Sequence, residues 1–470
     1  MRYGEHTASY NLGDRLLTRD ERVIVGTRPG SREPIRFTEH MKRDRDHPKA
    51  IIRHGVFSDG EYLPTFLTKN CLEDDQYDRF LENYQKEGKN IFGQGLKGQT
   101  VYIVNTFSKY LTPQDLDTRI CFIADTAKYN GAEAVVLVDL TLFHSAQERG
   151  IWDLDHPRMH EEKSRKMYDG QAPVLETVMR MYLVSGVDAI IAPHTHSPPD
   201  TEKIVARLND EFSPLAKNAS ENQLTRRYSL KFFNINLAKM IGYYISDHSE
   251  AYLGFDLSDK GKNVAFIAPD RGIYPFIEEV RLHSGLTNSA LAGMNKKKSE
   301  NGRMIELTLE QSINLSEERG LEGMYLFIGD DSIRTGRTMA INIDVIRGIR
   351  HEGIVMDSKI KGKPKKIVVY ATRTNFGGDS VDILSTPSID DIVITNADPR
   401  GWYGTRELDI KTQMLWMNFM MADAAKAIEA GQDPYEVLTA DHIREKDLLR
   451  IQTDHGHKDR VGKTKTGKKY

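Results

Sequence analysis

The stretch Leu326-Phe-Ile-Gly-Asp330-Asp331-Ser-Ile-Arg-Thr335-Gly336-Arg-Thr338 is the most informative part of the sequence for the fold. A hydrophobic run passes into two adjacent acids, then into a short Thr-Gly-x-Thr loop, and a helical period follows. This order predicts a strand, a turn and a helix start, and open α/β sheets bind ligands at the carboxyl ends of their strands. Amides at a helix N-terminus favour an anion. Because the carboxylates can accept hydrogen bonds from sugar hydroxyls, the stretch predicts a sugar-phosphate site.

The same alternation of strand and helix runs through most of the chain. Val101–Val104 and Ala134–Val138 read as buried strands, and Thr112-Pro113 is a good helix start between them. Further short strands are expected at Arg22–Val25, Asp188–Ala192, Asn263–Ala268, Ser289–Met294, Tyr325–Ile328, Ile367–Tyr370 and Asp391–Ile394. Strands that alternate with helices indicate mainly parallel sheets, and the restart after about residue 230 favours two α/β domains.

Three further helices are expected from the spacing of apolar residues. They cover Val174–Tyr182, Thr338–Arg350 and Leu408–Ala430. The last of these carries a methionine stripe, which is typical of core packing. The segment Pro198–Arg226 is rich in Pro, Asn and Ser and is expected to connect the two domains.

The composition narrows the class of protein. The chain has 470 residues, 39% hydrophobic and 28% charged, with a net charge of −3, which suits a globular protein without a general attraction to nucleic acid. No apolar run approaches the ~20 residues that cross a bilayer, and the N-terminus has no secretory hydrophobic stretch. Cys71 and Cys121 are too few for a disulfide scaffold. We therefore expect a cytoplasmic protein that contacts neither membrane nor nucleic acid.

Several segments, in the same order along the chain, resemble those of ribose-phosphate diphosphokinases (phosphoribosyl pyrophosphate synthetases). The loop after Asp331 resembles the phosphoribosyl diphosphate-binding loop of the phosphoribosyltransferase fold. His54-Gly-Val-Phe57-Ser-Asp59-Gly-Glu61 is similar to a Phe-Ser-Asp-Gly-Glu segment that this family inserts beside the ATP adenine, usually from a neighbouring subunit. The resemblance spans roughly residues 50 to 432.

The resemblance implies the roles of other residues. Ala189–Ser197 is similar to a strand that ends in a magnesium-associated His, here His196, and 268–272 resembles a Ser-Pro-Asp-x-Gly whose Asp, here Asp270, also serves magnesium. Asn295–Lys298 resembles the catalytic Lys-x-Arg of a flexible loop, which implies that Lys296 and Lys298 are catalytic. Shorter likenesses lie at Phe232–Ile235, 371–380 and Ile392–Pro399.

The chemistry of these residue types is consistent with those roles. Transfer of a diphosphoryl group needs Mg²⁺ on the phosphates, cations on the nonbridging oxygens and an in-line hydroxyl. Mg²⁺ prefers oxygen ligands, so Asp270 is the better candidate ligand and His196 could act through water.

The sequence also departs from the family pattern. Where the family has Ala-Arg-Gln-Asp-Arg, this chain has Ser-Ala-Gln147-Glu-Arg149 and so lacks the first Arg. Arg373 stands for the His of the family's Ala-Thr-His segment, and Lys298 stands for an Arg, which loses its bidentate fork. Extra residues lie at 1–48, 150–168, 200–228 and 435–470.

The implied fold is α/β, with two phosphoribosyltransferase-like domains, each a mainly parallel sheet flanked by helices. We expect an N-terminal extension (1–48), an ATP-side domain (49–199), a ribose-phosphate-side domain (200–400), a helix that packs back on the first domain (401–434) and an extension with a basic tail (435–470).

The implied function is a Mg²⁺-dependent diphosphokinase that uses ATP and ribose 5-phosphate, as a homo-oligomer whose ATP site is shared between subunits. The expected ATP-binding residues are Phe57, Asp59, Glu61, Gln147 and Arg149. The expected ribose-phosphate-binding residues are Asp330, Asp331, Ser332, Arg334, Thr335, Gly336, Arg337 and Thr338. Three alternatives remain open: the same transfer to a larger acceptor such as ADP-ribose, a non-catalytic regulatory relative, and an ordinary phosphoribosyltransferase.

Overall fold

The computed structural model divides the chain into two compact units. Unit 1 contains 1–243, 397–400 and 417–444, and unit 2 contains 244–396, 401–416 and 445–470. The residues that the structure describes are 22–27, 50–59, 61–68, 96–108, 110–149, 162, 171–218, 228–298, 305–315, 318–333, 335–349, 354–356, 362–374, 380–385, 389–397, 410–437 and 449–451.

Unit 1 contains a five-stranded parallel sheet. Its strands, in spatial order, are β1 (Arg22–Gly26), β4 (Thr100–Asn105), β5 (Ala134–Asp139), β6 (Ala189–Pro193) and β7 (Lys231–Ile235). Each strand pairs in parallel with the next. Every residue of the three inner strands is buried, which is why they read as continuous apolar runs in the sequence.

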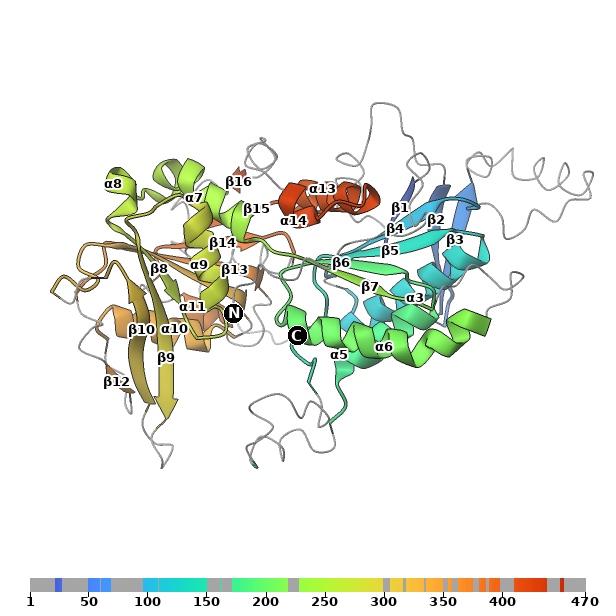
Figure 1. Cartoon of the computed structure of the whole chain (residues 1–470), viewed down its shortest axis with the longest axis horizontal. Helices are drawn as coiled ribbons and strands as arrows, with labels where there is room; N and C mark the ends of the chain where they lie inside the picture. The colour runs from blue at the N-terminus through green and yellow to red at the C-terminus, as the bar shows by residue number, and fades with distance from the viewer. Residues whose placement is uncertain are drawn as a thin grey trace, which may run out of the picture. The chain divides into compact units, whose positions relative to one another are not determined.

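Three helices join these strands: α3 (Pro113–Tyr129), α5 (Val174–Val184) and α6 (Pro198–Asn218). They lie along one side of the sheet (Figure 1). The start of α3 is a capping box, because the Thr112 hydroxyl accepts from the Asp115 amide and the Asp115 carboxylate accepts from the Thr112 amide.

The interpretation of Pro198–Arg226 as a connection between domains is wrong for its first part. Residues 198–218 form α6, which leads into β7, the last strand of the unit 1 sheet. The structure therefore divides the chain inside α7 (Ala238–Leu253), after Tyr243, and the expected boundary at 199/200 falls within α6. The two prolines that suggested a linker begin the helix, where proline is tolerated.

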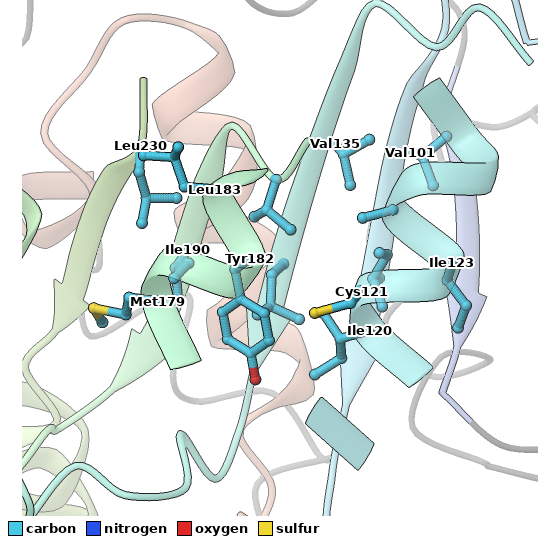
Figure 2. Packing of buried hydrophobic residues seen from close by; sticks show 14 of the residues in the cluster. Val101, Ile120, Cys121, Ile123, Val135, Met179, Tyr182, Leu183, Ile190 and Leu230 are labelled. Carbon is cyan, nitrogen blue, oxygen red and sulfur yellow. The ribbon is translucent and has the colours of Figure 1, made fainter. Parts of the chain in front are cut away.

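The core of unit 1 fills the space between α3, α5 and the sheet. Figure 2 shows Ile120 and Cys121 of α3 on the side of Tyr182 of α5, with Met179 and Leu183 of the same helix nearby. Each of these five side chains is buried. Beside the sheet, β2 (Ala50–Val56) and β3 (Tyr62–Thr68) form an antiparallel hairpin, and the Tyr62 ring stacks on Phe122 of α3 at 6.5 Å between ring centroids.

Unit 2 contains a nine-stranded mixed sheet. Its spatial order is β12-β10-β9-β8-β11-β13-β14-β15-β16. The strands are β8 (Val264–Ala268), β9 (Ala290–Lys298), β10 (Ile305–Ile313), β11 (Tyr325–Ile333), β12 (Ile354–Met356), β13 (Lys366–Thr374), β14 (Asp391–Thr395), β15 (Lys411–Leu415) and β16 (Leu449–Ile451). The neighbouring strands β9, β8, β11, β13, β14 and β15 pair in parallel. β10 pairs antiparallel with β9, and β16 pairs antiparallel with β15.

The other helices in the described part of the chain, apart from α7, are short. They are α8 (Ser258–Gly261), α9 (Tyr274–His283), α10 (Arg337–Ile346), α11 (Ser380–Leu384), α13 (Asn418–Glu429) and α14 (Pro434–Val437). The last two belong to unit 1, where the Tyr102 hydroxyl donates to Glu429 Oε1 at 2.7 Å. No described helix has the length and apolar character of a membrane span.

The expected helix Leu408–Ala430 is wrong over its first half. Residues 411–415 form β15, and α13 starts at Asn418. The buried Gln413 side chain bonds the Tyr244 hydroxyl and donates to the Tyr252 carbonyl at 2.9 Å. Pairing along β14 and these side-chain bonds outweigh helical periodicity. The fold class is confirmed, since both units are parallel or mainly parallel sheets flanked by helices.

Candidate functional site

A reversal of strand order in unit 2 defines the candidate site. From β8 the chain runs through α9 to β9 on one side, and then returns to β11 on the other side of β8. The carboxyl ends of β8 and β11 therefore flank a topological switch point, the place where open α/β sheets form their ligand crevice. In unit 1 the described strands follow one another without such a reversal.

Two acids lie at the end of β11, inside the strand. The strand continues to Ile333, beyond the expected Tyr325–Ile328; residues 330–332 are partly buried and Ile333 is buried. Burial raises the pKa of the Asp330 carboxyl well above its usual range, and the nearby Asp331 and Asp270 carboxylates raise it further. Asp330 Oδ1 also accepts from the Asp331 amide at 2.8 Å. Three predicted residues, Asp270, Asp330 and Asp331, thus interact at the switch point.

Asp270 also has a structural role in the turn after β8. Its Oδ1 atom accepts from the amides of Gly272 at 2.8 Å and Ile273 at 3.2 Å, just before α9 begins. The residue is exposed. The turn thus uses Asp270 Oδ1 to accept both amides, and Oδ2 takes no part in these two hydrogen bonds.

Arg373 lies at the end of the neighbouring strand β13, opposite Ser332 of β11. Its Nη2 atom is 3.4 Å from Asp331 Oδ2, and both side chains are largely buried. The departure from the family's His thus brings a cation against a carboxylate that we expected to bind ribose. Ser332 Oγ donates to the other oxygen of Asp331 at 3.4 Å.

Thr335 and Gly336 precede the N-terminus of α10. Gly336 is the N-cap and has φ +71°, a left-handed conformation that glycine adopts without strain. The first amides of a helix have no partner inside it and suit an anion. Thr335, Arg337 and Thr338 are exposed around this turn, and Arg334 lies outside the described residues.

The two predicted catalytic lysines do not lie in a loop. Lys296 and Lys298 belong to β9, where they pair with Leu307 and Ile305 of the antiparallel β10. The expectation of a flexible loop is wrong for these positions, because pairing with β10 extends β9 to Lys298.

A second cluster lies in unit 1 at the carboxyl ends of β5 and β6. His196 Nδ1 is 3.3 Å from Glu148 Oε1, and Arg149 Nε is 3.5 Å from the same oxygen. Arg149 Nε is also 3.4 Å from Asp200 Oδ2. Gln147 is exposed next to this group. The structure thus brings together Arg149 and His196, which the sequence assigned to ATP and magnesium.

Sequence analysis missed a chain of polar side chains at the carboxyl ends of β1, β4 and β5. Thr27 Oγ1 donates to Asn105 Oδ1 at 3.0 Å, and Asn105 Nδ2 donates to Asp139 Oδ1 at 3.0 Å. Burial raises the pKa of the Asp139 carboxyl. Glu148 and Asp200 were missed as well. The available signal was position, since Asn105 and Asp139 end buried strands and Glu148 follows one.

The predicted adenine segment is the turn of the β2–β3 hairpin. The Phe57 amide donates to the Glu61 carbonyl at 2.8 Å, and the Glu61 amide donates to Asp59 Oδ1 at 3.1 Å. The Phe57 side chain is 56% exposed. Phe57, Asp59 and Glu61 thus lie on an exposed turn in unit 1, whereas the acids of β11 belong to unit 2.

Comparison with known proteins supports the fold. The chain is similar to the crystal structure of phosphoribosylpyrophosphate synthetase from Mycobacterium smegmatis, with a TM-score of 0.56 and 12% sequence identity over 87% of this chain and 98% of that one. No protein-family model matches the sequence, and no curated protein matches it either. At this identity the likeness shows a shared two-unit α/β fold.

Proposed function

We propose that the protein is a Mg²⁺-dependent diphosphokinase. It transfers the diphosphoryl group of ATP to the anomeric hydroxyl of ribose 5-phosphate and yields phosphoribosyl pyrophosphate and AMP. One observation carries the proposal: at a switch point, two acids lie near the end of β11 and a left-handed glycine leads directly into a helix N-terminus. Such a site suits a phosphorylated sugar. The fold similarity to a phosphoribosylpyrophosphate synthetase supports the same reading.

The acceptor would be held by β11 and α10. Asp330 and Asp331 would bind the ribose hydroxyls. The residues from Ser332 to Thr338, between the end of β11 and the first turn of α10, would bind the 5-phosphate. The anomeric oxygen then attacks the β-phosphorus of ATP as the bond to the α-phosphate oxygen breaks, and AMP leaves. Binding in this way supplies the alignment on which phosphoryl transfer depends.

The candidate donor contacts are those that the resemblance assigns. Phe57, Asp59 and Glu61 would contact the adenosine, with Gln147 and Arg149 toward the phosphates, and Lys296 and Lys298 would neutralise the transferring group. The exposure of Phe57 supports a hairpin that serves the nucleotide site of a neighbouring subunit in a homo-oligomer.

The carboxylates of unit 2 suit magnesium. Among the described residues, no group of three or more His, Cys, Asp or Glu forms a ready metal cluster. Mg²⁺ in nucleotide sites, however, is usually held by one or two carboxylates together with substrate phosphates. Asp270 would supply one such oxygen in unit 2. The resemblance also assigns His196, in unit 1, to magnesium. When bound, Mg²⁺ neutralises the charge of the phosphates.

The proposal is tested by mixing the protein with ATP, Mg²⁺ and ribose 5-phosphate and measuring AMP and the diphosphorylated sugar. Asp331→Asn should lower kcat/KM for the sugar by about 10²-fold, as expected for removal of one group that fixes the substrate. Absence of AMP formation with every ribose phosphate offered would refute a diphosphokinase.

A larger acceptor is the second candidate. Arg337 is exposed in the first turn of α10 and adds positive charge next to the site of the 5-phosphate. This charge favours an acceptor whose 5-phosphate is extended to a diphosphate, as in ADP-ribose. A higher kcat/KM for ADP-ribose than for ribose 5-phosphate, lost in Arg337→Gln, would select this version.

A further inference from the structure

Glu148 and His196 face each other across the ends of two neighbouring strands. Glu148 follows β5, and its side chain is 2% exposed; His196 follows β6, and its side chain is 40% exposed. The contact joins Glu148 Oε1 to His196 Nδ1 at 3.3 Å. The carboxylate is therefore buried beneath a histidine that reaches the surface.

The other contacts of the Glu148 carboxylate are longer than its contact with His196. Arg149 Nε approaches the same Oε1 atom at 3.5 Å and lies slightly nearer to Asp200, at 3.4 Å. Asp200 Oδ2 in turn accepts from Ser197 Oγ at 2.8 Å. Glu148 Oε2 is buried and forms no hydrogen bond in the described part of the chain. The imidazole is thus the closest polar partner of this buried carboxylate.

The backbone around His196 is held in place. His194, directly after β6, has φ +38°, a strained value for a residue with a side chain. Thr195 is anchored to Asn234 Oδ1 through its amide at 2.8 Å and its hydroxyl at 3.0 Å. Strain that is fixed by neighbouring contacts concentrates at functional sites. The segment 194–197 is therefore built to place His196 in one position.

We propose that Glu148 is a positioning residue that fixes the tautomer of His196. A carboxylate only accepts hydrogen bonds, so Nδ1 must carry the proton that faces it. In the neutral ring, Nε2 is then the nitrogen with the lone pair. Carboxylate–histidine pairs of this kind orient metal-ligating imidazoles in many proteins.

The assignment of that lone pair to a ligand rests on the proposed function. In the diphosphokinase it would accept from a water of the Mg²⁺–ATP complex, at the end of β6. The tautomer of His196 does not depend on the reaction, so an experiment can refute the tautomer or the reaction without refuting the other.

The tautomer is tested by ¹⁵N NMR of the full chain labelled at histidine, at pH 8, with the His196 signals assigned by loss in His196→Gln. The wild type should show a protonated Nδ1 and an unprotonated Nε2. Glu148→Ala should shift the ring toward the Nε2–H form, and Glu148→Gln, whose amide oxygen still accepts, should retain most of the Nδ1–H form. A wild-type Nε2–H ring, or no change in Glu148→Ala, would overturn the proposal.

Asp200→Asn is the matched control. It removes a carboxylate that contacts Arg149 but leaves the Glu148–His196 contact, so the tautomer should stay as in the wild type. A tautomer change as large as that of Glu148→Ala would assign the effect to the general charge of the cluster and refute a specific role for Glu148.

The proposed contact of His196 with the metal–ATP complex is tested with Mn²⁺ as a spin probe in the presence of ATP. Loss of the positioning carboxylate should weaken Mn²⁺ binding by about 10-fold or more, in the range seen for such partners of metal ligands. Unchanged Mn²⁺ affinity would refute the cation role, whatever the NMR result. A protein without diphosphokinase activity that still shows the Nδ1–H tautomer would refute the proposed reaction and not the positioning.

Discussion

The Nη2 atom of Arg373 lies 3.4 Å from Asp331 Oδ2 at the carboxyl ends of two paired strands, β13 and β11. The cation neutralises one of the acids in a site that also contains Asp330 and Asp270. Without it, a cluster of three carboxyl groups would lose one positive charge. Arg373 thus helps to balance the negative charge of the site.

Replacement of Arg373 should affect the sugar more than the nucleotide. Arg373→Met should lower kcat/KM for the acceptor by about 10²-fold, because Asp331 loses the cation at 3.4 Å, while KM for ATP changes less than about 3-fold. Arg373→Lys keeps the charge and should recover part of the loss. AMP release at varied concentrations of each substrate measures both values. Equal effects on the two substrates would contradict the assignment of Arg373 to the acceptor side.

Lys128 and Asp188 form a buried ion pair in unit 1, before the amino ends of β5 and β6. Lys128 Nζ is 2.7 Å from Asp188 Oδ2, with side chains 0% and 4% exposed. Lys128→Met should cost about 3–5 kcal/mol of unfolding free energy, since it leaves a buried carboxylate without its cation. Urea unfolding measures the loss. Lys203→Met, which removes an exposed pair with Asp200 at 3.8 Å, should cost below about 1 kcal/mol.

Much of the fold could be predicted from sequence because the inner strands are buried on both faces. Val101–Val104, Ala134–Val138 and Asp391–Ile394 were predicted almost to the residue. Thr112 fixed the start of α3 through its capping box. Local sequence patterns predicted these elements correctly because the tertiary contacts stabilise the same secondary structure that the patterns favour.

The errors arose where tertiary contacts compete with local pattern. Lys411–Leu415 has an apolar spacing that suits a helix, but pairing with β14 makes it a strand. Lys296 and Lys298 look like a solvated charge run, yet they extend β9. The cluster of Glu148 with His196 could not be predicted either, because it depends on how two loops 48 residues apart approach each other.

His54 makes the stability of the β2–β3 hairpin depend on pH. Burial, aided by the Arg119 cation, lowers the pKa of His54 to about 4 from its usual 6.5. The unfolded chain therefore binds a proton between pH 6.5 and 4 that the folded hairpin does not. Stability is complete above pH 6.5 and falls as the pH drops through this window.

The loss should amount to about 1–2 kcal/mol at pH 4, roughly half of what the pKa difference implies, because the site is partly exposed. Urea unfolding between pH 7 and 4 measures it. In His54→Asn, which keeps a neutral polar group but cannot titrate, the dependence should flatten by this amount. A wild-type profile that is no steeper than that of the variant would contradict the assignment.

Gly336 should be sensitive both to backbone strain and to contact. It has φ +71°, and an added Cβ would lie 2.7 Å from Cγ of Leu384 in α11. Gly336→Ala should therefore cost more than the ~1–2 kcal/mol of the left-handed conformation alone, and it should shift the first amides of α10. We expect KM for the phosphorylated acceptor to rise at least 10-fold.

Gly348, just after α10 ends, is the matched control. It has φ +79° but no atom within 4 Å of an added Cβ, so Gly348→Ala should show the conformational cost with an unchanged acceptor KM. Adding Leu384→Ala to Gly336→Ala should relieve the contact and recover part of the lost affinity. If Gly336→Ala and Gly348→Ala raise KM equally, the effect comes from general destabilisation, and the turn before α10 does not hold the phosphate.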